Sequence, residues 1–558
     1  MRPLRTVLRP AAGCAAAVVM ALGLAVAPQA QRPKFLTDDP LQREPDTQDA
    51  SKVQEWEIGL ASDLVWNLFT KPGDLTPHVR AQNANTIDEV PDSTWFTNRI
   101  YRRPISVDEI TRGPNTIDGA APGRWTVIRP KSAGVAPGFT VRDEKGETWF
   151  VVFDPRGYPI APTAAISVAT RLFWALGYNQ VETYLTTVRP ENVVIDPEAT
   201  IRAHGERRPF VQADLDEVFD RAARNEDGSY RVSVGRAVPG RPVGGFKYYG
   251  TRPDDPNDVI PHEHRRELRA LQVFGAWANL VDMKAGNTLD TVVTEGGRGI
   301  VHHYLQDVGS TFGTGALAPR DGDEGYEYLY EGGPMVKRLV SFGFALSPWQ
   351  TVDYREHPQI GKFEGEQFEP EEWVPRVPVA ALVRARADDT LWGALRVMAF
   401  TDDLIRAAVR TGGYTDPAAE ELLTDILIKR RDTIGRVYTA KINPLTRFAL
   451  DESGALAFEN PSVRAGYAAA PKGGYQAAWS RFDNATRATQ PIGSATTSQQ
   501  ERVQAPADLP RGDGTFIKVS VSAVDPPHPA WATPVDVYFR RVGGAWKLVG
   551  VERLPEGQ

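Results

Sequence analysis

The sequence predicts an α+β fold with a small antiparallel β region that includes one helix, a larger mainly helical region and a small C-terminal β module. Short β-type segments separated by turns rich in Gly, Pro and Asn lie within residues 122–200. Apolar residues recur at helical spacing in residues 262–281 and again through much of 370–438. Strand patterns return in residues 514–558, around the Gly-Gly pair 543–544.

The composition is that of a folded, net acidic protein. Of the 558 residues, 64 are Lys or Arg and 71 are Asp or Glu, which gives a formal net charge of −7. The 41% hydrophobic content supports large cores and excludes global disorder. Because binding to phosphate backbones needs a basic footprint, we expect no nucleic-acid partner.

Residues 1–30 are typical of a signal peptide. Three arginines precede the apolar, Ala-rich segment 11–27, which ends in the small-x-small pattern of residues 25–27. We therefore expect an exported protein, periplasmic or extracellular, with an uncleaved anchor as the alternative. No other run approaches the roughly 18 apolar residues of a membrane span, so no transmembrane segment is expected after cleavage. The single cysteine, Cys14, lies in this segment, which excludes disulfides and Cys-based zinc sites from the mature chain.

Residues 31–121 are expected to form an N-terminal arm and embellishment, of which residues 31 to about 60 are extended or flexible. The β region follows at 122–200, where helical spacing and a terminal Gly177 predict one helix over 161–176. The flanking sequence predicts strands at 125–129, 139–142, 148–153, 182–188 and 192–195.

Residues 201–440 are expected to be mainly helical. A polar, turn-rich stretch covers 202–260, a helix covers 262–281, and a hairpin around Gly296-Gly297 follows. The Gly-, Ala-, Ser- and Thr-rich segment 441–513 is expected to be a linker to the β module 514–558, whose predicted strands are 515–524, 535–541 and 546–553.

The candidate chemistry lies around the predicted hairpin. Asp282 and Asn287, in Asp-Met-Lys-Ala-Gly-Asn, follow the long helix, and Asp307-Val-Gly309 follows the hairpin. Phosphoryl transfer needs oxygen ligands for Mg²⁺ and a carboxylate near the attacking hydroxyl, which these residue types supply. The alternative is that Asp282 ends a helix and Asp307 lies in an ordinary turn.

This order of Asp-x4-Asn, hairpin and Asp-x-Gly resembles the catalytic and metal-binding loops of the protein-kinase-like superfamily. The resemblance is closest to its atypical branches, the phosphoinositide kinases, HipA-like kinases, spore-coat CotH kinases and secretory-pathway kinases. It implies a two-lobed protein-kinase-like fold over residues 122–440, with a small β lobe and a larger helical lobe. It further implies that Asp282 is the catalytic base and that Asn287 and Asp307 hold Mg²⁺ or Mn²⁺ on the phosphates of ATP.

The sequence departs from the kinase pattern in the β region. Strand 148–153 lacks the phosphate-binding lysine of a V-A-I-K pattern, and helix 161–176 lacks the glutamate that would pair with it. Losing both together is consistent, because an unpaired buried glutamate costs roughly several kcal/mol. Leu280-Val281 also replaces the usual His or Arg before the catalytic Asp.

A lysine in the preceding loop offers a replacement. Lys131 begins a glycine-containing loop that includes Gly134 and Gly138, where a glycine-rich loop would cover the nucleotide. The kinases known as "with no lysine" supply their lysine from this side of the lobe, which makes these three residues candidates for cofactor binding. The alternative is a solvated loop lysine.

Two function classes follow from these residues. The first is an exported atypical kinase that uses ATP with Mg²⁺ or Mn²⁺ on an unknown protein, small-molecule or envelope substrate. The second is a catalytically inactive pseudokinase that acts as a cell-envelope or extracellular binding protein or scaffold. A third, remote alternative is an unrelated hydrolase.

Other polar clusters rank lower as functional sites. His262 and His264 lack the His-Glu-x-x-His spacing, so they are expected to cap or form salt bridges rather than bind zinc. The acidic run Asp254, Asp255 and Asp258 is expected to be a solvated turn, with Ca²⁺ binding as the alternative.

Overall fold

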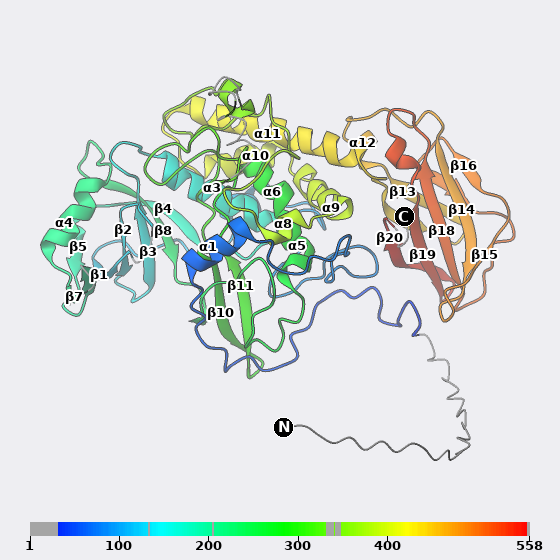
Figure 1. Cartoon of the computed structure of the whole chain (residues 1–558), viewed down its shortest axis with the longest axis horizontal. Coiled ribbons are helices and arrows are strands. Elements are labelled where there is room, and N and C mark those ends of the chain that lie inside the picture. The colour runs from blue at the N-terminus through cyan, green and yellow to red at the C-terminus, as the bar shows by residue number, and fades with distance from the viewer. Residues whose placement is uncertain (1–31, 132–133, 204–205, 331–339, 341–346, 555–558) are drawn as a thin grey trace, which may run out of the picture.

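The structure, a computed structural model, describes residues 32–131, 134–203, 206–330, 340 and 347–554 (Figure 1). The chain has mixed α and β content with several separate sheets. The expected signal peptide, residues 1–30 with Cys14, lies outside the described residues. Among the helices that are described, none is both long enough and apolar enough to cross a bilayer.

A six-stranded sheet with the order β4-β8-β3-β2-β1-β5 lies at one end of the molecule (Figure 1). Its neighbours are antiparallel except β1 and β5, which are parallel. The structure confirms the predicted strands. Apolar residues at alternate positions along them pack into one shared core. The strands are β1 (Trp125–Pro130), β2 (Gly138–Arg142), β3 (Thr148–Phe153), β4 (Thr183–Val188), β5 (Val193–Ile195) and β8 (Tyr230–Arg236).

Helix α3 (Ala161–Leu176) has the predicted bounds and is buried over nearly its whole length. Its apolar residues, among them Leu172 and Phe173, belong to the core of the helical region rather than to the core of the sheet. The helix therefore joins the sheet to the helical region.

The sheet region extends beyond residue 200, which corrects the expected boundary. Between β4 and β8 the chain forms the hairpin β6 (Thr200–Ala203) and β7 (Glu206–Pro209), followed by α4 (Gln212–Arg221). Leu215 and Phe219, four residues apart on α4, pack into the core of the sheet. Apart from these residues and the buried Phe210, much of the insertion is polar, which favours a turn-rich stretch in the sequence.

The helical region lies at the centre of the molecule (Figure 1). The predicted helix 262–281 is interrupted, and it ends at Asn279, whose φ of 53° is left-handed. Its pieces are the 3₁₀ turn η2 (His262–His264), α5 (Arg266–Arg269) and α6 (Leu271–Ala278). The later helices are α8 (Ala380–Val383), α9 (Ala387–Met398), α10 (Asp402–Arg410) and α11 (Pro417–Ala440). The predicted hairpin is confirmed as β10 (Thr288–Glu295) and β11 (Arg298–Leu305), with the short β9 (Arg241–Pro242) beside β10.

The C-terminal β module begins near Thr446 rather than at residue 514. Segment 441–513, expected to be a linker, contains six strands and shares one apolar core with the strands that follow. These short strands carry many small and polar residues, which hid them in the sequence. The module comprises β12 (Thr446–Leu450), β13 (Ala455–Glu459), α12 (Pro461–Arg464), β14 (Tyr475–Phe482), β15 (Thr489–Pro491), β16 (Thr496–Ser498), β17 (Arg502–Gln504), β18 (Phe516–Ala523), β19 (Val535–Val542) and β20 (Ala545–Glu552).

The N-terminal segment packs along the molecule instead of standing apart as a flexible arm. Phe35 contacts Phe482 and Tyr538 of the C-terminal module. Trp95 and Phe96 are buried in the core of the helical region. The segment contains two helices, α1 (Leu60–Phe69) and α2 (Val107–Arg112).

Candidate functional site

The loop after α6 is fixed to the segment that follows Asp307. Asn279 ends α6 in the left-handed conformation that Asn tolerates, and its Oδ1 accepts a 2.8 Å hydrogen bond from Trp373 Nε1. Two residues later the backbone N–H of Val281 donates to the carbonyl of Ser310 at 3.3 Å. The loop containing Asp282 and the loop containing Asp307 therefore run side by side.

Asn287 connects the two predicted aspartates. Its side-chain Nδ2 donates a 2.7 Å hydrogen bond to the backbone carbonyl of Asp282. Its own carbonyl accepts from the backbone N–H groups of Gln306 and Asp307, both at 3.1 Å. The 3₁₀ turn η3 (Ala285–Asn287) gives Asn287 this position between the two loops. Asn287 thus ties the backbone at Asp282 to the backbone at Asp307.

Asp307 has an exposed carboxylate with free bonding capacity. Its Oδ1 accepts a 3.0 Å hydrogen bond from the backbone of Gly309, while Oδ2 takes part in no hydrogen bond or ion pair formed by the described residues. A Cβ added at Gly309 would lie only 2.8 Å from Cγ1 of Ile166, so this loop lies directly against α3. The absence of a side chain at Gly309 allows this close approach.

Lys131 folds back over the glycine-containing loop. Its Nζ donates to the carbonyl of Ala136 at 3.4 Å. A Cβ at Gly138 would clash with the carbonyl of Val151 on β3 and would lie 3.3 Å from Cδ of Lys131. Gly134 has a φ of +80°, a conformation that favours glycine. The loop therefore needs both glycines to adopt this shape.

An electrostatic interaction connects Lys131 with Asp307. Desolvation lowers the pKa of the Lys131 ammonium, and the Asp307 carboxylate opposes this change. Arg221, at the end of α4, donates a 2.6 Å hydrogen bond to the carbonyl of Val135 and adds a second positive charge near Lys131. Lys131 is thus the cation of this loop that interacts with Asp307.

Two cations beside Asp282 were missed in the sequence. The Nζ of Lys284 lies 2.8 Å from the Asp282 carboxylate, and the charge of Arg320 also acts on it. Burial opposes ionisation of Asp282, but Lys284, Arg320 and Asn287 outweigh it, so the pKa of Asp282 is lowered. Lys284 has extended backbone two residues after Asp282, and this spacing could have predicted the pair. Nothing in the sequence near Asp282 indicates that Arg320 lies close to it.

Arg320 is itself held by a network around the loop. It donates to Oγ of Ser310 at 2.8 Å and pairs with Glu324 at 3.3 Å. Glu324 also lies 3.5 Å from Arg376, whose backbone N–H donates to the carbonyl of Val281. Arg320 is therefore a positioned cation whose charge acts on Asp282.

The missing strand lysine and helix glutamate are not replaced at the same positions. Val151 of β3 is buried in the core of the sheet. The nearby Asp154 accepts from the backbone and hydroxyl of Thr163 at 3.0 and 2.9 Å and lies 3.6 Å from Arg231. Burial raises the pKa of Asp154, and through its bonds to Thr163 this residue attaches α3 to the sheet.

A hydrophobic surface flanks η3. A Cβ at Gly286 would lie 3.1 Å from Cδ1 of Leu60, so α1 packs on this turn. The orientation of α1 is unusual because its charged Asp63 is buried and accepts a 2.9 Å hydrogen bond from Tyr249, while Trp66 and Phe69 are 57% and 61% exposed. The site therefore has a large apolar surface beside it.

The side chains at this site could bind a metal ion only together with a ligand that supplies further oxygen atoms. Among the described residues, no three His, Cys, Asp or Glu side chains gather into a group that could hold an ion. Asp307 and Asn287 supply one carboxylate and one amide. Mg²⁺ commonly uses one or two carboxylates and takes its other oxygens from phosphates and water, so this pair suits a metal that arrives with a nucleotide.

The lower-ranking clusters are structural. His262 and His264 form ion-pair contacts with Asp258 at 2.7 Å and Asp74 at 3.0 Å, which confirms the expected salt-bridging role. The expectation of a solvated turn was wrong for Asp255 and Asp258, which are 6% and 5% exposed because the N-terminal segment packs over this loop.

Comparison with known proteins gives kinase structures at low similarity. No family model and no curated protein matches the chain. A crystal structure of the Golgi casein kinase with Mn/ADP bound has a TM-score of 0.29 and 10% identity, and the match covers 60% of this chain and 78% of that chain. Another structure of the Golgi casein kinase has a TM-score of 0.29 and 11% identity, covering 71% and 96%.

Proposed function

We propose that this protein is an atypical, kinase-like phosphotransferase that moves the terminal phosphate of ATP to a hydroxyl group. The observation that carries the proposal is the position of Asn287, which is hydrogen-bonded to Asp282 through its side chain and to Asp307 through its carbonyl. A base for the acceptor and a ligand for the metal must lie on either side of one reacting phosphate, and this link supports the proposal by tying together the backbones that carry the two carboxylates.

Asp282 is suited to orient the acceptor hydroxyl. Its side chain is 19% exposed, and its lowered pKa keeps it ionised at neutral pH. In the proposed step the hydroxyl oxygen forms a bond to the terminal phosphorus, the bond from that phosphorus to the bridging oxygen breaks, and the hydroxyl proton passes to Asp282. ADP carries away the electron pair of the broken bond.

Asp307 and Asn287 would hold Mg²⁺ or Mn²⁺ with the phosphates, and the ion would neutralise their charge. Lys131 would contact the phosphates from above, in place of the missing strand lysine, with Gly134 and Gly138 leaving room for the nucleotide. In this proposal the six-stranded sheet with α3 and the helical region correspond to the two lobes of a kinase.

The acceptor would be a protein, a small molecule or an envelope component. Export, proposed from residues 1–30, would put the reaction in the periplasm or outside the cell. The exposed apolar residues of α1 beside η3 favour an acceptor that also has apolar groups to cover them.

A pseudokinase is the second candidate. The 2.8 Å ion pair between Lys284 and Asp282 occupies the carboxylate that would serve as base, and β3 lacks the phosphate-binding lysine. In this case the chain would bind nucleotide, or a partner, without transferring phosphate.

A thermal melt combined with a radiolabel transfer assay separates the candidates. Wild type is expected to melt at a higher temperature with Mn²⁺ and ATP, since a ligand at about 100 times its Kd stabilises by about 2.7 kcal/mol. Asp307→Asn should abolish this shift, whereas Asp282→Asn should keep it and lose transfer. The exposed Asp425→Asn on α11 is the control. A shift without transfer indicates the pseudokinase. If wild type shows no shift and no transfer, a nucleotide site is ruled out.

A further inference from the structure

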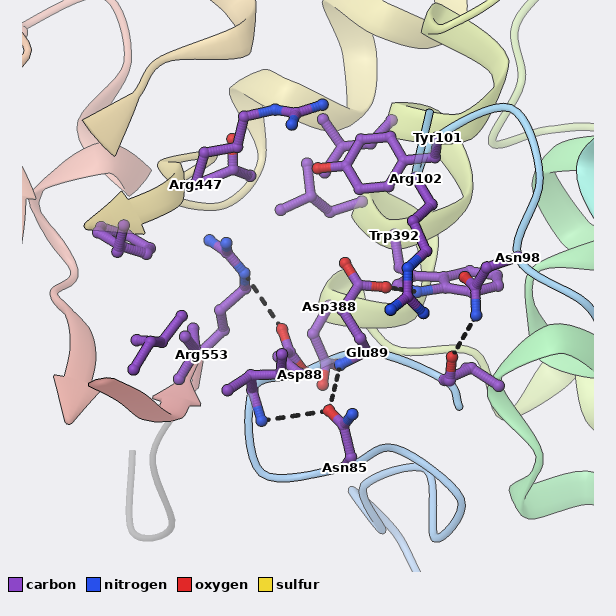
Figure 2. A pocket seen from close by; sticks show the side chains of 18 of the residues that line it. Asn85, Asp88, Glu89, Asn98, Tyr101, Arg102, Asp388, Trp392, Arg447 and Arg553 are labelled. Atoms are coloured by element: carbon purple, nitrogen blue, oxygen red, sulfur yellow. Dashed lines mark hydrogen bonds and ion pairs between the residues drawn. The ribbon is translucent and has the colours of Figure 1, made fainter. Parts of the chain in front are cut away.

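A cavity of about 320 Å³ lies where the C-terminal β module meets the helical region (Figure 2). Its walls come from residues 85–102, from α9, and from β12 and the end of β20. It shares no residue with the site around Asp282 and Asp307. Its volume falls in the range of small-molecule pockets, about 300–1,000 Å³.

The acidic side chains of this cavity are already neutralised. Asp88 pairs with Arg266 at 2.7 Å and with Arg553 at 3.2 Å, an ion pair drawn in Figure 2. Asp388 also pairs with Arg266, at 3.0 Å. Glu89 accepts from Arg396 at 2.7 Å. A ligand would therefore meet little net negative charge from these carboxylates.

One arginine at the cavity has no carboxylate partner among the described residues, and a second shares its partner with another arginine. Arg102 hydrogen-bonds to the neutral Gln42 at 3.3 Å, and no carboxylate of a described residue lies within ion-pair distance of it. Arg447 lies 3.2 Å from Glu459, which also pairs with Arg464 at 2.8 Å, and Arg464 in turn pairs with Glu501 at 2.8 Å. The charge of Arg447 is therefore shared within a balanced surface cluster, and the surplus positive charge at the cavity comes from Arg102.

The backbone at Arg447 is held in a conformation that is unusual for an arginine. Its φ of 54° lies in the left-handed region, which non-glycine residues rarely adopt. Its guanidinium lies 5.5 Å from the ring centre of Tyr101, and the two side chains lie on the same side of the cavity in Figure 2. The Tyr101 hydroxyl forms no hydrogen bond with any described residue, so it is available to a ligand.

The remaining walls are apolar. Leu391 of α9, Phe448 of β12 and Leu548 and Val551 of β20 line the cavity, and Phe448 and Leu391 are buried. Burying an apolar group here is favourable by roughly 25 cal/mol per Å² of apolar surface removed from water. An occupant thus needs an apolar body as well as an anionic group.

We propose that this cavity binds a small amphipathic anion, a molecule with one carboxylate-like head and an apolar body. The head would lie at Arg447 and the Tyr101 hydroxyl, with Arg102 adding positive charge elsewhere on the cavity wall, and the body would lie against the apolar walls. Because the walls belong to α9 on one side and to β12 and β20 on the other, the ligand would bridge the β module and the helical region. This inference does not depend on the proposed phosphotransferase activity.

Octanoate and octylammonium test the proposal on the full chain, since they share an apolar body and differ in the charge of the head. Titration calorimetry and thermal melts should give saturable octanoate binding with a higher melting temperature, and at least tenfold weaker binding of octylammonium. No octanoate binding at 10 mM, or equal binding of the two probes, would overturn the proposal.

Matched variants locate the binding site. Arg447→Gly removes the guanidinium and relieves the left-handed backbone, so it should stay folded and weaken octanoate binding at least tenfold; Arg102→Ala should also weaken it. Arg464→Ala removes an arginine that shares Glu459 but does not line the cavity, and it should bind as wild type does. Unchanged octanoate binding by both Arg447→Gly and Arg102→Ala would place the ligand elsewhere and overturn the proposal.

Discussion

Asn287 donates a 2.7 Å hydrogen bond from its side chain to the backbone carbonyl of Asp282. This bond closes the loop between the two residues and fixes the direction from which the Asp282 side chain leaves the backbone. Because the carbonyl of Asn287 also accepts from Asp307, movement of Asn287 would displace both aspartates together.

Asn287→Ala is therefore expected to lower the free energy of unfolding by about 1 kcal/mol, the typical contribution of one hydrogen bond. It should also remove the metal-dependent nucleotide shift, because both the loop closure and the amide oxygen are lost. Urea unfolding and melts with Mn²⁺ and ATP measure the two effects. Asn192→Ala, on an exposed turn, is the control, and an unchanged nucleotide shift in Asn287→Ala would contradict the proposed role.

Lys284→Met tests the electrostatics of Asp282. The pKa of Asp282 is lowered in the folded protein, so its ionised form contributes stability that is fully present above the unfolded pKa of about 4 and is lost as the pH falls through the folded pKa. Without Lys284 the variant should be less stable at pH 7 by about 0.5–1 kcal/mol, since the pair is partly exposed. The difference should shrink toward pH 3. Urea unfolding at both pH values measures it, with the exposed Lys145→Met as control; an equal difference at both pH values would contradict this account.

Gly138→Ala tests the shape of the glycine-containing loop. The new Cβ would clash with the carbonyl of Val151, a backbone atom that cannot rotate away. We expect a loss of about 1–3 kcal/mol, as for overpacked sites, together with weaker nucleotide binding. Gly157→Ala is the matched control, because a Cβ there meets no atom within 4 Å. Equal stability of the two variants in urea unfolding would show that the loop tolerates a side chain.

Local patterns were enough to predict much of the fold. The periodicity of residues 161–176 and the glycine that follows gave the bounds of α3, because nearly every position of that helix is buried or packed. The predicted 262–281 helix failed because its N-terminal part is stabilised by buried ion pairs, such as Arg266 with Asp389 at 2.9 Å, rather than by an apolar stripe. Such pairs join residues distant in sequence and leave no periodic signal.

In the candidate site, too, the residues with a local sequence pattern could be predicted, and those brought in from distant segments could not. The loops of Asp282 and Asp307 were recognisable because their spacing is local, and Lys284 could have been found from the two-residue spacing of an extended segment. Arg320 could not, since it reaches Asp282 from a segment without regular structure and depends on Ser310 and Glu324 for its position. In segment 441–513, exposed residues such as those of β15 concealed strands whose partners lie further along the chain.

Lys131→Met tests which lysine contacts the phosphates. Lys131 interacts electrostatically with Asp307, whereas Lys284 pairs with Asp282, so the two lysines serve opposite sides of the proposed reaction. An ammonium acts on phosphate as a point charge at short range, and its loss should weaken Mn²⁺–ATP binding at least tenfold.

The same substitution should change stability little, because the Lys131 side chain makes one long hydrogen bond, 3.4 Å to Ala136. Lys131→Arg keeps the positive charge and should retain part of the affinity, while Lys145→Met, on the turn after β2, should match wild type. Nucleotide titrations followed by thermal melts measure the three variants. If Lys131→Met binds as wild type and Lys284→Met does not, the phosphates lie over the Asp282 loop and Lys131 has no role in binding them. If both variants bind as wild type, neither lysine contacts the nucleotide, and the charge that replaces the missing strand lysine must come from an arginine such as Arg221.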